Sequence, residues 1–96
     1  MNYRNPKLLA SAKGEACVNC DAQDGTVVWA HSNQIEHGKG TGIKAHDLLG
    51  LYLCARCHRW YDGHMTRIEA RAFFMDLYPK TMVRVAEKIA NGKLKL

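Results

Sequence analysis

Two pairs of cysteines, each with the spacing C-x-x-C, constrain the fold of this chain more than any other feature. The first pair is Cys17 and Cys20, and the second is Cys54 and Cys57. Each C-x-x-C turn aims two thiolates at one point, and two such turns complete the tetrahedron of a structural zinc ion. In a reducing compartment this spacing favours metal over disulfides or separate redox dithiols. The sequence therefore predicts one structural zinc ion with four cysteine ligands.

The length of the chain indicates how many domains it forms, and its charge indicates what kind of partner it binds. With 96 residues the chain is expected to form a single domain over 1–96, small enough to benefit from a metal staple. Its formal net charge of +5 indicates an anionic partner, of which nucleic acid is the commonest, although a basic soluble domain without such a partner has the same charge. No signal peptide and no membrane-spanning apolar run are visible, which predicts a cytoplasmic protein without membrane contact.

Sequence patterns predict an α+β fold. A short helix is expected over 6–13, strands over 26–31 and 48–53, and a helix over 55–61. The two strands, the second cysteine pair and the helix that follows would form a ββα unit, with His31 at the end of the first strand and His58 on the helix. A capping box at Thr66 then opens a helical extension over 66–91, in which Pro79 is expected to separate two helices. Leu94 and Leu96 are expected to lie in a frayed tail.

Clustered histidines mark the candidate active site. All five histidines lie between Trp29 and Met65. His58 and Asp62 stand four residues apart on the predicted helix, so their side chains share one face and suit a divalent ion such as Mg²⁺, Mn²⁺, Zn²⁺ or Ni²⁺. Alternatively, Asp62 only ends the helix, and His58 is a further zinc ligand or part of a C-x-x-C-H haem attachment site.

His31 closes the first predicted strand, and the zinc ion would bring that strand close to the helix bearing His58. An imidazole facing a metal-bound phosphate is a suitable general base for activating water, although a lone histidine is more often structural. The loop between the strands contains Gly38, Gly40 and Gly42. With Lys39 and Lys44 it is either a phosphate-binding loop or a flexible surface loop.

The ordered set of motifs over 17–63 resembles the HNH, or His-Me finger, endonucleases, and in particular small phage- and prophage-encoded members. The resemblance rests on the cysteine pairs, on Trp29-Ala30-His31, on the Gly-rich loop with Ala45-His46-Asp47-Leu48, and on Leu53-Cys54 to Cys57-His58. It implies a zinc-stabilised ββα-metal domain with added N- and C-terminal helices. The implied activity is metal-dependent DNA cleavage or nicking in the bacterial host cytosol, with DNA and phage or host recombination proteins as partners.

Residue roles follow from the same resemblance. It assigns His31 as general base, Asp47 as the residue that orients the base, and His58 with Asp62 as ligands of a catalytic Mg²⁺, Mn²⁺ or other divalent ion. The chain departs from the family pattern at Ala30, where many members have a metal ligand, and at Asp47, where they have asparagine. His37, His46 and His64 remain possible extra ligands, and His46 an alternative base.

Basic residues that flank the proposed site are the candidates for phosphate contacts, namely Lys39, Lys44, Arg56 and Arg59. The competing interpretation is a non-catalytic zinc module that binds DNA or a phage or host protein through the same basic face. A binding module has no need of His31 or Asp62, so these two residues discriminate between the interpretations.

Overall fold

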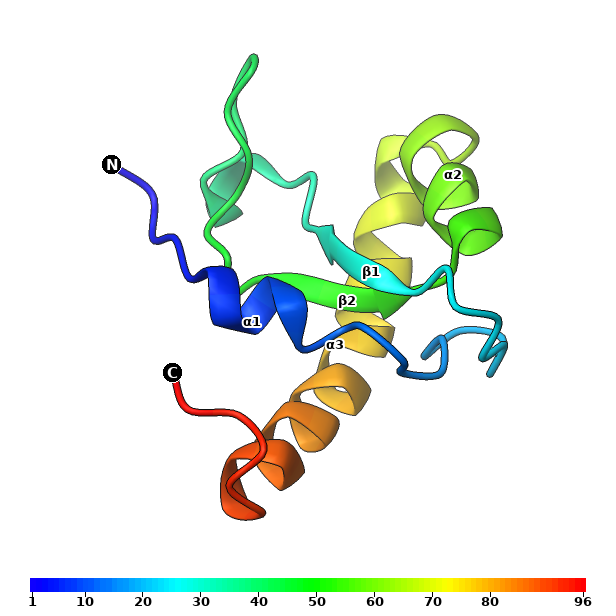
Figure 1. Ribbon diagram of the computed structural model, residues 1–96. Coiled ribbons are helices and arrows are strands. Elements are labelled where there is room, and N and C mark those ends of the chain that lie inside the picture. The colour runs from blue at the N-terminus through cyan, green and yellow to red at the C-terminus, as the bar shows by residue number, and fades with distance from the viewer.

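The computed structural model describes all 96 residues and confirms a small α+β fold. Three α-helices accompany one two-stranded sheet (Figure 1). In chain order the elements are α1 (Pro6–Ala10), β1 (Val28–His31), the 3-10 helix η1 (Ile35–His37), β2 (Gly50–Leu53), α2 (Ala55–Gly63) and α3 (Arg67–Ala90). The expected succession of strand, strand and helix is therefore present as β1, β2 and α2.

The two strands form an antiparallel pair in which His31 lies opposite Gly50. All four residues of β2 are buried. β1 begins at Val28, later than the predicted residue 26, and the backbone amide of Thr26 donates to the Asp24 carboxylate at 3.0 Å. The Thr26 hydroxyl bonds the Asp24 carboxylate at 2.6 Å and accepts a hydrogen bond from the amide of Ala55 at 2.9 Å. Thr26 therefore links the start of β1 to the start of α2.

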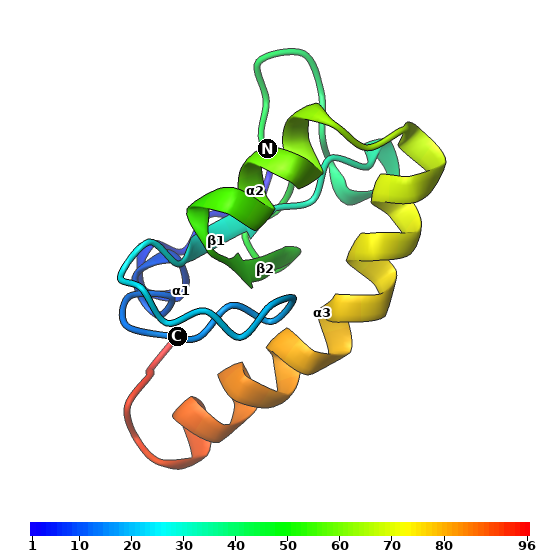
Figure 2. The same cartoon turned by 90° about the vertical axis from the view of Figure 1, so that its right-hand side faces the viewer.

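α1 and α3 cover opposite faces of the sheet, so that the strands lie between two helical layers (Figure 2). Asn5 caps α1, and its side-chain oxygen accepts hydrogen bonds from the first turn. The helix ends at Ala10, three residues before the predicted end at residue 13. Leu8 is fully buried and joins α1 to the core that the sheet shares with α3.

The C-terminal extension is one helix, so the expectation of two helices separated by Pro79 was wrong. α3 opens with the predicted capping box between Thr66 and Glu69 and continues to Ala90. Proline removes one backbone donor and bends a helix, and α3 curves along its length (Figure 2). The stripe of buried residues in α3 continues on both sides of Pro79, and its packing compensates for the backbone hydrogen bond lost at the proline. The stripe consists of Ala70, Phe74, Leu77, Thr81 and Val85.

Leu94 anchors the residues after α3 to the core, so the expectation of a frayed tail was wrong for this residue. This side chain is only 6 % exposed and belongs to the main hydrophobic cluster, whereas Leu96 is exposed. One continuous cluster therefore extends from Leu8 in α1 to Leu94. None of the helices combines the length and the apolar character needed to cross a membrane.

Candidate active site

The four cysteines form a compact cluster at the junction of the sheet and α2. Their sulfur atoms all lie within 4.8 Å of one another, and the Sγ atoms of Cys20 and Cys54 are 3.7 Å apart. Zinc–sulfur bonds of about 2.3 Å place the corners of a tetrahedron roughly 3.8 Å apart. The four thiols are thus compatible with structural zinc, as the sequence predicted.

Local hydrogen bonds shape both cysteine turns. The amide of Cys17 donates to the carbonyl of Ala22 at 2.8 Å, and the carbonyl of Cys54, the N-cap residue of α2, accepts from the amide of His58 at 2.9 Å. A backbone hydrogen bond from Ala22 holds the pKa of Cys20 at about 7, whereas burial raises the pKa of Cys57 to about 12. Without metal, Cys57 therefore retains its proton at neutral pH, and metal binding must release it.

His31 and Asp47 form the first half of the candidate active site. The Nε2 atom of His31 lies 2.7 Å from Oδ1 of Asp47, whose side chain is 3 % exposed. An ionised carboxylate only accepts hydrogen bonds, so Nε2 carries the proton of this bond and Nδ1 is left as the basic nitrogen of a neutral ring. The pair fixes both the orientation and the tautomer of His31.

Two residues at the start of the chain hold the Asp47 carboxylate. The backbone amide of Asn5 donates to Oδ2 at 2.6 Å, and Nη1 of Arg4 donates to Oδ1 at 3.0 Å. Burial raises the pKa of Asp47, but the hydrogen bonds from His31, Asn5 and Arg4 outweigh this effect, and the pKa lies below its usual value. Asp47 is therefore ionised at neutral pH. The indole Nε1 of Trp29 also donates to the backbone carbonyl of Asp47 at 2.8 Å.

Sequence reasoning missed Arg4 and Asn5. The same short segment also holds the loop between the strands, because Asn2 donates to the carbonyl of Gly38 at 2.7 Å and Arg4 donates to the carbonyl of Lys44 at 2.7 Å. These contacts join positions about forty residues apart in the chain. No local motif signals such contacts, so only the folded chain reveals them.

His58 and Asp62 form the second half of the site on α2. Their Nε2 and Oδ2 atoms are 2.9 Å apart, as the four-residue spacing predicted. Both side chains reach solvent, and no third histidine, cysteine or carboxylate joins them in a tight group. Ala30 is fully buried and offers no ligand. One imidazole and one carboxylate suit a divalent ion that keeps several water ligands.

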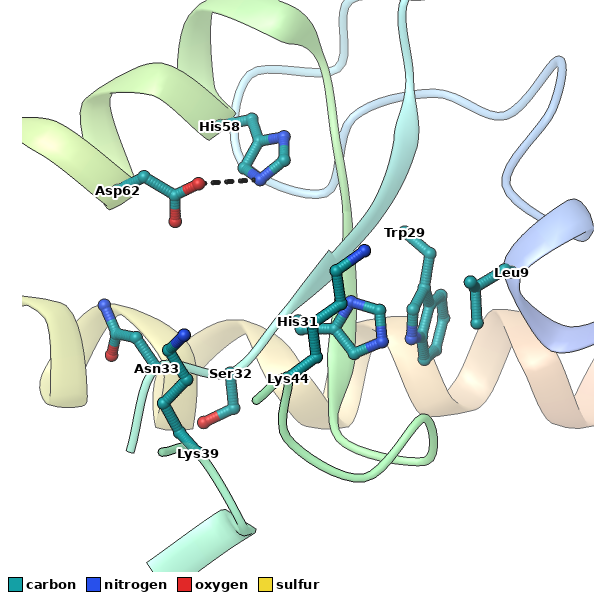
Figure 3. A pocket seen from close by; sticks show the side chains of 9 residues that line it. All are labelled: Leu9, Trp29, His31, Ser32, Asn33, Lys39, Lys44, His58 and Asp62. Carbon is teal, nitrogen blue, oxygen red and sulfur yellow. Dashed lines mark ion pairs between the residues drawn. The ribbon is translucent and has the colours of Figure 1, made fainter. Parts of the chain in front are cut away.

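A single open hollow of about 340 Å³ brings the two halves together. In Figure 3, His58 and Asp62 approach from α2 on one side, while His31 lies across from them at the end of β1. Lys39 and Lys44 reach the same hollow from the Gly-rich loop. The remaining lining residues are Leu9, Trp29, Ser32 and Asn33. The hollow therefore combines a positioned imidazole, an imidazole–carboxylate pair and two cations.

The other histidines have separate partners. Nδ1 of His37 bonds the hydroxyl of Ser32 at 2.6 Å, and Nδ1 of His46 accepts a hydrogen bond from the amide of Tyr3 at 2.9 Å. His64 stacks on Trp60, with ring centroids 4.8 Å apart. None of the three lines the hollow, so the structure does not bring them to the candidate site as ligands or as an alternative base.

The two predicted arginine contacts also lie elsewhere. Arg56 lines a separate hollow with Trp60, and Arg59 lines neither hollow. Of the four basic residues expected near the site, only Lys39 and Lys44 are there. In comparisons with known proteins, no family, curated protein or solved structure matches the chain.

Proposed function

We propose that this protein is a metal-dependent DNA endonuclease or nickase of the HNH, or His-Me finger, type. One observation carries the proposal: His31, held by Asp47 at 2.7 Å, faces the His58–Asp62 pair across one hollow. Phosphodiester hydrolysis requires a base for water and positive charge for the phosphate. The hollow contains candidates for both functions, and its two lysines favour an anionic substrate.

His31 acts as the general base in this mechanism. Its Nε2–H group remains bonded to Asp47, and Nδ1 accepts a proton from water as the water oxygen bonds to phosphorus. The imidazolium that forms is stabilised by the Asp47 carboxylate beside it. The opposite phosphorus–oxygen bond of the DNA backbone breaks in the same displacement.

Positive charge at the phosphate has two sources. Lys39 and Lys44 bind the substrate phosphates from the loop side of the hollow. A divalent ion bound by His58 and Asp62 would neutralise the scissile phosphate and stabilise the leaving oxygen. The cysteine cluster keeps α2 in place, since Cys54 caps the helix and Cys57 directly precedes His58.

Cleavage of supercoiled plasmid tests the proposal. Wild type, His31→Ala and His64→Ala are incubated with plasmid and Mg²⁺, Mn²⁺ or Ni²⁺, and nicked and linear products are quantified. We expect His31→Ala to lose about 10²-fold or more in rate, as for removal of a general base, while His64→Ala cuts like wild type. Equal rates for all three proteins would refute the catalytic assignment, and a protein that binds plasmid without cutting it would be a zinc-binding module.

A further inference from the structure

The backbone of the turn after α3 is held by contacts with the core and with the end of the helix. Leu94 is buried in the core, and its amide and that of Lys93 donate to the carbonyl of Lys88 at 3.1 and 2.9 Å. Gly92 adopts φ +73°, which reverses the chain after the helix. Because Leu94 points into the core, Lys93 and Lys95 on either side of it are exposed. The segment runs back towards α1 in both views (Figures 1 and 2).

A second hollow, of about 400 Å³, lies between α1 and this turn. Every charged residue that lines it is a lysine: Lys7, Lys88, Lys93 and Lys95, which we call the C-terminal lysine surface. Lys88 pairs with Glu15 at 2.8 Å. The other three have no carboxylate partner within 4.0 Å. Of the four lysines, only Lys88 is therefore paired with a carboxylate.

Four lysines that line one hollow suit a partner with a row of negative charges. Nucleic acid meets this requirement, because each phosphate contact neutralises a lysine and releases counterions. Lysine is also the residue that contacts phosphate as a point charge without demanding a particular geometry. A single carboxylate or small anion would neutralise only part of the positive charge on the C-terminal lysine surface. A nucleic-acid backbone has one negative charge per phosphate and can neutralise every lysine of the surface.

The short helix α1 separates this surface from the candidate active site. Leu9 of α1 lines the catalytic hollow, whereas Lys7 and Ser11 line the second one. We infer that the C-terminal lysine surface binds the DNA backbone flanking the cleavage position, so that one DNA molecule crosses α1 and contacts both hollows. This inference rests on the proposed function for its substrate, but it concerns a surface outside the catalytic site.

Salt-dependent binding tests the inference. Wild type, a K93Q/K95Q variant and a K13Q/K80Q variant are titrated against a fluorescent duplex of about 20 base pairs, longer than the 36 Å protein. Both variants lose two positive charges from exposed sites, but Lys13 and Lys80 line neither hollow. Affinity is measured by fluorescence anisotropy at several salt concentrations, and thermal unfolding verifies that each variant folds.

We expect K93Q/K95Q to lower the slope of log affinity against log salt by about 2, because each phosphate contact contributes about 0.9. K13Q/K80Q should retain the wild-type slope. Identical slopes for the two variants, or a wild type that does not bind the duplex, would overturn the inference. Cleavage of the same duplex is assayed separately, so a protein that shows the slope change but never cuts would refute the nuclease function and leave the lysine surface supported.

Discussion

The indole of Trp29 lies directly over the backbone of Gly50, on the neighbouring strand. A Cβ atom added at Gly50 would come within 2.3 Å of the indole Nε1 and 2.4 Å of Cε2. The same Nε1 donates to the carbonyl of Asp47. The absence of a side chain at Gly50 therefore allows Trp29 to hold the residue that orients His31.

Gly50→Ala should destabilise the protein because the methyl group displaces the indole. The expected loss is about 1–3 kcal/mol, the usual cost of overpacking, measured by urea unfolding. Gly63→Ala is the matched control, since a Cβ there meets nothing within 4 Å and the residue lies in a helix. The control should be neutral or slightly stabilising. Similar losses in both variants would contradict the role assigned to Gly50.

Asp47→Asn should remove the charge that stabilises the His31 proton and lower the cleavage rate. It should also cost about 2–3 kcal/mol of unfolding free energy at pH 7, since charged hydrogen bonds from His31, Asn5 and Arg4 are lost. Asp47 has a lowered pKa in the folded state, so its contribution is complete above the unfolded value of 3.8 and disappears as pH falls through the folded pKa.

Urea unfolding of wild type and Asp47→Asn from pH 7 to pH 2 measures this contribution. The difference in unfolding free energy between the two proteins should shrink as the pH falls below about 4. Taking the difference removes acid effects on the cysteine cluster, which both proteins share. A difference in unfolding free energy that stays constant or grows between pH 4 and pH 2 would show that the Asp47 carboxylate is not stabilised by the fold.

Cys54→Ser should greatly lower the melting temperature, and native protein should contain one zinc per chain. Structural zinc supplies on the order of 10 kcal/mol of folding free energy, and serine is a poor replacement for a thiolate ligand. Elemental analysis and thermal unfolding measure the two quantities. Native protein without zinc, or a Cys17–Cys20 disulfide under reducing conditions, is the result that would contradict the metal site.

His58→Ala and Asp62→Asn should each abolish metal-stimulated cleavage while retaining zinc and the fold. Both side chains are partly solvent-exposed and lie outside the hydrophobic core, so their loss leaves the core packing intact. The matched control for the second variant is Asp76→Asn, on the exposed surface of α3. Product formation over a Mn²⁺ titration gives the measurement. Wild-type metal dependence in both variants would exclude this pair as the ion-binding site.

Local sequence patterns predicted the parts of the molecule that depend on short spacing. The C-x-x-C pairs, the pairing of His58 with Asp62 and the Thr66–Glu69 capping box all join residues within four positions of one another. The proximity of Asp47 to His31 came from a family resemblance and not from such spacing. The contact between His31 and Asp47 joins positions sixteen residues apart in the chain.

Tertiary contacts account for the predictions that were wrong. A proline usually ends a helix, but buried side chains on both sides of Pro79 keep α3 continuous. Leu94 carries no local signal of burial, and only its contact with the core shows that the tail is ordered. The contacts of Arg4 and Asn5 with Asp47 depend in the same way on segments that meet only after folding.

The position of the cysteine cluster has a consequence for how metal dependence is measured. Cys54 is the N-cap residue of the helix that bears His58 and Asp62, so removing metal from the cluster would disturb both side chains together with the fold. A chelator that stops DNA cleavage would therefore give the same readout whether it removed a catalytic ion or dismantled the scaffold. Counting zinc in the inactivated protein distinguishes the loss of a catalytic ion from the unfolding of the protein.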